Sequence, residues 1–226
     1  GKMVYENIPV PIDGWNSKLG YPQNAEKTYS GPTSVSYALV KSLNVPTVRI
    51  LLSKLTPEVS YNYMRSLNIS ESMLSLSPSL LALGSSGSYL TEYVGAYATL
   101  ANNGVYREPL SITKIINKDG EELYNSESQI FRQVFKKSTA YIITQWLHRA
   151  ASKPECPIQI DLSVNPGIEC AGKTGTNENV RGIAYLGYTK YYTCGVWMGH
   201  DDFVHGFTLG TSALYNATPF WRAVMN

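Results

Sequence analysis

The sequence predicts an α+β fold, in which an antiparallel sheet flanked by helices meets a helical lobe at a cleft. Two observations predict it. Helical periodicity dominates the first half of the chain, whereas strand formers gather in the second half, where residues 183–189 and 192–199 make a candidate hairpin. Helices followed by strands are typical of α+β domains. The chain has 226 residues, 43% of them hydrophobic, so it can bury a sizeable core.

Composition disfavours several classes of partner. The net charge is +2 and no long run of like charge occurs, so neither nucleic acid nor an electrostatic membrane patch is expected. No apolar run reaches the roughly 18 residues of a membrane-spanning helix. The start, Gly1-Lys2-Met3-Val4, is neither a translation start nor a signal peptide. We therefore expect a piece of a longer protein, incomplete at the N-terminus.

Proline and glycine divide the chain into an arm and a domain. Residues 1–32 show little periodicity and are expected to form an extended N-terminal arm. Residues 33–226 are expected to form the rest of the fold. Within them we predict a mainly helical lobe over 33–108 and a sheet lobe over 109–226.

Start and stop residues mark the helices of the first lobe. Thr33 or Ser34 can cap the first helix, and Thr56 followed by Pro57 opens another. Asn103-Gly104 predicts a left-handed stop. Helices are predicted at residues 33–41, 45–54, 56–67 and 91–102, and residues 70–90 are expected to be irregular.

The second lobe combines strands with two helices. Ser138 is expected to cap a helix ending at Ala151, with Ile142 and Leu147 among the residues facing inward. Strands are predicted at residues 110–116, 122–124, 183–189 and 192–199, and a last helix at 217–225.

The segment Gly172-Lys173-Thr174-Gly175-Thr176 is the main candidate site. A lysine, two hydroxyls and bare glycine backbone can hold an anion. Two motifs fit it. One is the Lys-Thr-Gly motif of penicillin-binding proteins and class A β-lactamases. The other is a P-loop, because Gly167 to Thr174 satisfies G-x-x-x-x-G-K-[ST]. A P-loop requires a helix after Thr174, and the following residues lack helical periodicity, so the P-loop is the less favoured alternative.

Cysteine and histidine clusters give weaker signals. The chain has three cysteines, and Cys156 and Cys170 flank a loop whose length suits a local disulfide. Cys194 falls in a predicted strand and is expected to be a small buried hydrophobe. The segment from His200 to His205 is interpreted as a polar turn rather than a metal site.

A second motif adds specificity. Ser42-Leu43-Asn44 lies between two predicted helices, and Lys173-Thr174-Gly175-Thr176 follows it on a predicted strand. Together they resemble the transpeptidase domain of penicillin-binding proteins, of the class A, bifunctional type. The resemblance includes the segments around them and covers essentially the whole chain from about Tyr21. Segments similar to the family lie at residues 31–49, 77–84, 96–104, 187–189, 195–199 and 219–221.

The resemblance implies acyl transfer through a serine ester, with a peptide ending in D-Ala-D-Ala, or a β-lactam that mimics it, as donor. It implies that Ser42 relays a proton and that Lys173 supplies positive charge near the donor carboxylate. Asn44 would hold the donor's backbone. Thr174, Gly175 and Thr176 would bind the donor along the strand. No metal or organic cofactor is implied, and the expected location is the extracytoplasmic face of the bacterial membrane.

Two departures qualify the resemblance. The family's nucleophile is the serine of a Ser-x-x-Lys motif that precedes Ser-x-Asn. The only literal match here, Ser111 to Lys114, follows Ser42 and falls on a predicted strand, where residues i and i+3 point to opposite faces. We interpret it as chance and expect the nucleophile on an upstream segment, which leaves this chain inactive alone. The family's Arg-Asp-Ala-Trp is replaced by residues 181–184, Arg-Gly-Ile-Ala. A non-catalytic, transpeptidase-like scaffold therefore remains an alternative.

Overall fold

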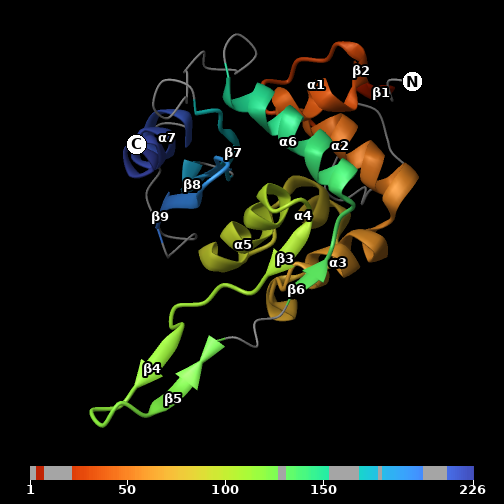
Figure 1. Ribbon diagram of the computed structural model, residues 1–226. Helices are drawn as coiled ribbons and strands as arrows, with labels where there is room; N and C mark the ends of the chain where they lie inside the picture. Colours follow the sequence, from red (N-terminus) through yellow and green to blue (C-terminus); the bar gives the residue numbers. More distant parts are fainter. Residues whose placement is uncertain (1–3, 8–21, 127–130, 153–167, 178–179, 201–212) are drawn as a thin grey trace.

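The computed structural model describes residues 4–7, 22–126, 131–152, 168–177, 180–200 and 213–226, and the side chains of these residues except 213–216 (Figure 1). It is an α+β fold with antiparallel sheets, as predicted. Strand β1 (Val4–Asn7), within the segment expected to be an extended arm, pairs with β2 (Gly31–Ser34), which runs past the end of that segment at residue 32.

The first lobe is built of short helices. Ser34 caps α1, since its side chain accepts a hydrogen bond from the backbone N–H of Tyr37 at 3.3 Å. Thr56 caps α3 in the same way, and Pro57 occupies the first helical position. The helices are α1 (Val35–Val40), α2 (Asn44–Ile50), the π-helical turn η2 (Leu51–Leu55), α3 (Pro57–Ser66), the 3₁₀ turn η3 (Glu71–Met73), α4 (Pro78–Leu83) and α5 (Leu90–Ala101).

Helix α4 corrects the prediction that residues 70–90 are irregular. Pro78 stands at its first turn and Gly84 ends it with a φ of 70°. These are ordinary start and stop signals, but a helix of six residues is too short to show an apolar stripe.

The sheet of the second lobe has the order β7-β8-β9, formed by β7 (Ala171–Thr176), β8 (Gly182–Tyr188) and β9 (Thr193–Gly199). Both pairings are antiparallel, so the predicted hairpin is confirmed. Helix α7 (Ala213–Met225) covers one face, where Trp221 is fully buried and packs edge-on against Tyr185. Leu186 and Tyr188 alternate with Tyr185 and so point to the opposite face, toward α5 and α6 (Lys137–Ala151).

Two expectations for the helix at residues 137–151 are wrong. Ser138 lies inside α6, whose N-cap is Lys136 without a side-chain hydrogen bond. Ile142 is 46% exposed instead of inward, whereas Ala140 and Leu147 are buried. The buried residues follow the side of the helix that the sheet contacts, which sequence periodicity alone does not identify.

Four further strands form two small ribbons. β3 (Val105–Arg107) pairs with β6 (Phe131–Gln133), and β4 (Lys114–Ile116) pairs with β5 (Glu122–Asn125). The β4–β5 hairpin projects from the body of the molecule (Figure 1). No helix among the described residues combines the length and the apolar character needed to cross a membrane.

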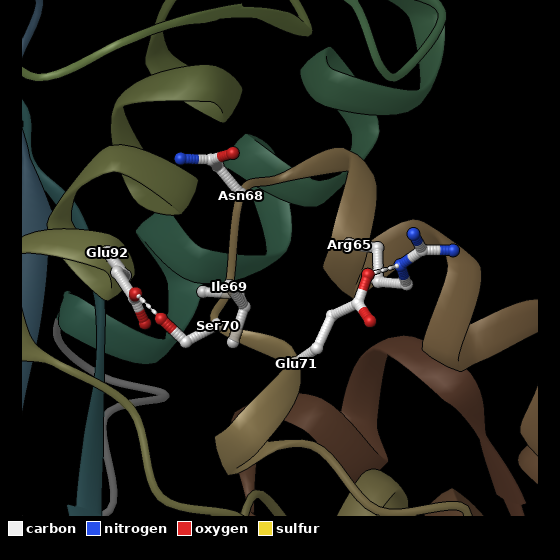
Figure 2. A pocket seen from close by; sticks show the side chains of 6 residues that line it. All are labelled: Arg65, Asn68, Ile69, Ser70, Glu71 and Glu92. Atoms are coloured by element: carbon white, nitrogen blue, oxygen red, sulfur yellow. Dashed lines mark hydrogen bonds and ion pairs between the residues drawn. The ribbon is translucent and has the colours of Figure 1, made fainter.

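A polar hollow lies where the loop after α3 meets the start of α5 (Figure 2). Its charged groups already have partners. Glu92 accepts hydrogen bonds from Ser70 and from Ser88, and Arg65 forms an ion pair with Glu71. We interpret these contacts as closing the helical lobe rather than as a binding site.

Candidate active site

Ser42 lies in the turn that joins α1 to α2, and it adopts a left-handed conformation with a φ of 57°. The backbone N–H of Ser42 donates to Leu39 O at 3.2 Å, and that of Leu43 donates to Ala38 O at 2.9 Å. This pair of bonds is the Schellman motif that ends many helices, and its left-handed position usually holds glycine. A serine there is disfavoured locally, and its exposed side chain is presented at the surface of the turn.

Lys173 brings the two predicted motifs together. It lies on β7 opposite Leu186, so its side chain leaves the sheet on the face that carries the helical lobe. Its Nζ donates a hydrogen bond to the Oγ of Ser42 at 3.0 Å, across 131 residues of sequence. It also lies 3.3 Å from Thr174 Oγ1 and 3.4 Å from the Thr174 carbonyl oxygen. A half-buried ammonium therefore faces the turn that carries Ser-x-Asn.

The rest of the segment extends along β7. Thr174 is half-buried, whereas Gly175 and Thr176 are exposed. β7 is the terminal strand of its described sheet, so β8 occupies only one of its edges. The other edge of such a strand can pair with an extended peptide through backbone hydrogen bonds.

The two glycines of this segment differ in surroundings. A Cβ at Gly172 would lie 2.4 Å from the hydroxyl oxygen of Tyr185, so packing requires glycine there. Among the described residues, a Cβ at Gly175 would meet only the Cβ of Ala184, at 3.8 Å, which is ordinary contact. The described part of the fold therefore does not require glycine at position 175.

Asn44 is the first residue of α2. Neither it nor Ser42 caps this helix, whose N-cap is Leu43 without a side-chain hydrogen bond. Instead, the Nδ2 of Asn44 donates to the carbonyl oxygen of Gln23 at 2.9 Å. Asn44 is thus tied to the segment before β2.

The literal Ser-x-x-Lys match does not form a nucleophile and base. Ser111 is exposed and precedes β4, so its predicted place on a strand is wrong. Lys114 lies on β4, where its ammonium forms an ion pair with Glu122 of β5. The β4–β5 hairpin that holds Lys114 projects from the body of the molecule (Figure 1).

The P-loop interpretation also lacks its structural context. Thr174 is followed by the strand residues Gly175 and Thr176, where a P-loop requires the first turn of a helix.

His148 has a structural role. Its Nδ1 donates to the carbonyl oxygen of Cys170 at 2.8 Å and so ties α6 to the residue before β7.

The remaining candidates are only partly described. Cys170 is buried, but Cys156 lies outside the described residues, so their disulfide stays a prediction. The same holds for the segment after His200. Cys194 is half-buried on β9, and burial raises the pKa of its thiol. Among the described residues, no group of three or more His, Cys, Asp or Glu side chains is placed to hold a metal.

Sequence reasoning missed the polar residues that support the Ser-x-Asn turn. Asn7 and Asn24 are 1% and 3% exposed. Neither stands in a periodic segment, and a buried asparagine has no local sequence signal. Only its distant partners reveal it.

Comparisons with known proteins identify the family of this chain. The penicillin binding protein transpeptidase domain family matches residues 11–201. Penicillin-binding protein 1F of Bacillus subtilis is 31% identical over 201 residues, which cover 84% of this chain and 27% of that protein. Penicillin-binding protein 1A of Clostridium botulinum is 28% identical over 208 residues, covering 88% of this chain and 24% of the relative.

Solved structures share the fold. Penicillin-binding protein 1A from Haemophilus influenzae superposes with a TM-score of 0.80 at 19% identity, over 99% of this chain and 38% of that one. PonA1 from Mycobacterium tuberculosis, in complex with penicillin V, superposes with a TM-score of 0.79 at 22% identity, over 99% of this chain and 62% of that one.

The chain therefore belongs to the penicillin-binding protein transpeptidase domain family. Its relatives include penicillin-binding proteins 1A, 1B and 1F, so its homology to the class A type is confirmed. The chain spans about a quarter of the length of the curated relatives it matches.

Proposed function

We propose that this chain supplies the Ser-x-Asn and Lys-Thr-Gly parts of a peptidoglycan D,D-transpeptidase that β-lactams acylate. The observation that carries the proposal is the 3.0 Å hydrogen bond from Lys173 Nζ to Ser42 Oγ. It joins two motifs that lie far apart in sequence and that have no structural reason to meet in a P-loop protein. Membership of the transpeptidase family supports the same activity.

The chemistry assigns each residue a step. A nucleophilic serine attacks the carbonyl of the penultimate D-alanine, an ester forms, and the terminal D-alanine leaves as an amine. The leaving nitrogen needs a proton. Ser42 accepts a hydrogen bond from Lys173, which leaves the hydroxyl hydrogen of Ser42 available for donation to that nitrogen. The charge of Lys173 favours the carboxylate of the donor.

The strand β7 would align the donor. Its exposed end carries Gly175 and Thr176, and its outer edge can accept an extended peptide. The hydroxyls of Thr174 and Thr176 would bind the donor carboxylate, and the backbone N–H of Thr176 would contribute to an oxyanion hole. Asn44 would hold the donor's amide.

The nucleophile is expected on a separate upstream segment with a Ser-x-x-Lys motif, and the complete protein is expected to act outside the cytoplasmic membrane. No metal or organic cofactor takes part in these steps. The 226-residue chain alone is therefore expected to be unable to form the serine ester.

Labelling with a fluorescent penicillin tests the proposal. The chain alone is compared with a polypeptide extended upstream as its gene encodes, by denaturing gel and intact mass. Label on the extended form only, at a serine before Ser42, is the expected result. Label on the chain alone would overturn the assignment of the nucleophile. A folded extended form that takes no label would favour the non-catalytic scaffold.

A further inference from the structure

Asn24 makes three hydrogen bonds beneath the Ser-x-Asn turn, although it lies in a segment without periodicity. Its Nδ2 donates to Asn7 Oδ1 and to the carbonyl oxygen of Thr28, both at 2.7 Å. Its Oδ1 accepts from the backbone N–H of Val45 at 3.2 Å. The side chain is almost completely buried. Its contacts with Asn7 and Val45 are buried, and its contact with Thr28 is partly buried.

The bond to Val45 replaces a missing helix cap. The first N–H groups of a helix have no partner within it, and α2 has no side-chain cap of its own. Asn24, which lies far from α2 in sequence, accepts a hydrogen bond from the N–H of the second helical residue. An N-cap side chain usually accepts this bond. The start of α2, and with it Asn44, is therefore held against the segment that carries Asn24.

Gln23, the residue before Asn24, fixes the orientation of the Asn44 amide. The carbonyl oxygen of Gln23 can only accept, so the Asn44 group facing it at 2.9 Å must be the NH₂. The amide NH₂ carries two hydrogens, so a second N–H of Asn44 and its Oδ1 both remain for a ligand. Such a pair of donor and acceptor suits the amide group of a peptide or of a β-lactam side chain.

Asn7 supports this arrangement from β1. It is 1% exposed, receives the bond from Asn24, and donates from its Nδ2 to Ser30 Oγ at 3.3 Å. A buried amide that loses its partner pays the full cost of its desolvation. The pair Asn7–Asn24 thus fixes the Gln23 carbonyl in place.

We propose that Asn24 is a positioning residue that holds the side-chain amide of Asn44 in the orientation in which it meets the bound acyl donor. This inference rests on the proposed function, since the orientation of Asn44 affects the reaction only if the cleft binds such a donor. Asn24 itself touches neither substrate nor reacting atoms.

The first test follows amide signals in the isotopically labelled chain itself. Asn24→Ala should speed hydrogen exchange at the Val45 N–H about tenfold and shift the side-chain NH₂ signals of Asn44. Asn24→Asp, which keeps an acceptor for Val45 but loses the NH₂, provides a second variant should the alanine variant fail to fold. Asn102→Ala is the matched control, because Asn102 donates from its Nδ2 to Val105 O in the helical lobe.

The second test measures penicillin acylation of the extended form in a double-mutant cycle. Asn24→Ala should lower the acylation rate about tenfold in the native background and hardly at all in an Asn44→Ala background. A purely structural role would give the same loss in both. Asn102→Ala should lower the stability of the fold, but its effect on the acylation rate should not depend on whether Asn44 is present.

The outcomes are separable. Unchanged Val45 and Asn44 signals in a folded variant, or a full loss in both backgrounds, would overturn the role of Asn24. If the unmutated extended form takes no label, the proposed function fails, and the amide signals alone decide whether Asn24 positions Asn44.

Discussion

The ammonium of Lys173 donates to the hydroxyl oxygen of Ser42 at 3.0 Å, across the junction of the sheet and the helical lobe. The contact links a strand residue to a turn residue that holds a left-handed conformation. A serine in this position is stable only because the surrounding Schellman motif fixes it. Substitutions of Ser42 should therefore change the stability of the turn and the function of the hydroxyl separately.

Two substitutions at Ser42 test this separation. In the extended form, Ser42→Ala and Ser42→Gly should both lower penicillin acylation by about 10²-fold, because the proton relay is lost. Ser42→Gly should nevertheless be roughly 0.5–1 kcal/mol more stable than Ser42→Ala, because glycine adopts the left-handed conformation without a steric cost. Urea denaturation of the two variants measures the difference, and equal stabilities would contradict the assigned strain.

Removing the charge of Lys173 should affect function more than folding. Lys173→Met is expected to fold and to lower acylation by about 10²–10³-fold, since a preorganised cationic donor is lost. Lys190→Met is the matched control, because Lys190 lies on the β8–β9 turn with its Nζ 4.8 Å from the centroid of the Tyr191 ring. Comparable losses in the two variants would argue against a specific role for Lys173.

The two glycines of β7 should respond differently to alanine. Gly172→Ala forces a Cβ against Tyr185 and should destabilise the fold by about 1–3 kcal/mol. Gly175→Ala should leave the melting temperature nearly unchanged and reduce acylation, because the new methyl group enters the space beside the strand that the donor would occupy. A Gly175→Ala variant with native acylation would show that the donor does not lie there.

Glu92 should make the helical lobe sensitive to acid (Figure 2). Burial alone would raise the pKa of Glu92, but hydrogen bonds from Ser70, Ser88 and the Tyr89 N–H together lower it. A carboxyl whose folded pKa is lowered stabilises the protein above its unfolded pKa, about 4.3, and loses that contribution as the pH falls through the folded value.

Glu92→Gln should therefore cost only about 0.2–1 kcal/mol at neutral pH, because solvent screens this partly exposed carboxylate. The difference from the native chain should shrink below about pH 4. Urea denaturation across pH 3–7 measures it. A cost that stays constant over this range would mean that the charge of Glu92 does not stabilise the lobe.

Local signals in the sequence determined those parts of the fold that depend on neighbouring residues. Thr56 and Pro57 opened α3 as predicted, because a cap and its N–H partner lie three residues apart. The strand-forming residues of 183–199 predicted β8 and β9, because β-branched and aromatic side chains favour extended backbone. The combination of Ser-x-Asn with Lys-Thr-Gly indicated the family before any contact was known.

Only the tertiary structure decided how the site is assembled. Ser42 and Lys173 are separated by 131 residues, and their contact depends on the face of β7 that packs toward the helical lobe. Asn24 gave no signal, because a buried amide is distinguished from an exposed one solely by its distant partners Asn7 and Val45. Ser138 shows the converse, because a favoured capping residue stands inside α6, whose N-cap is Lys136. Local chemistry thus determined the elements, whereas contacts between residues remote in sequence decided which side chains meet.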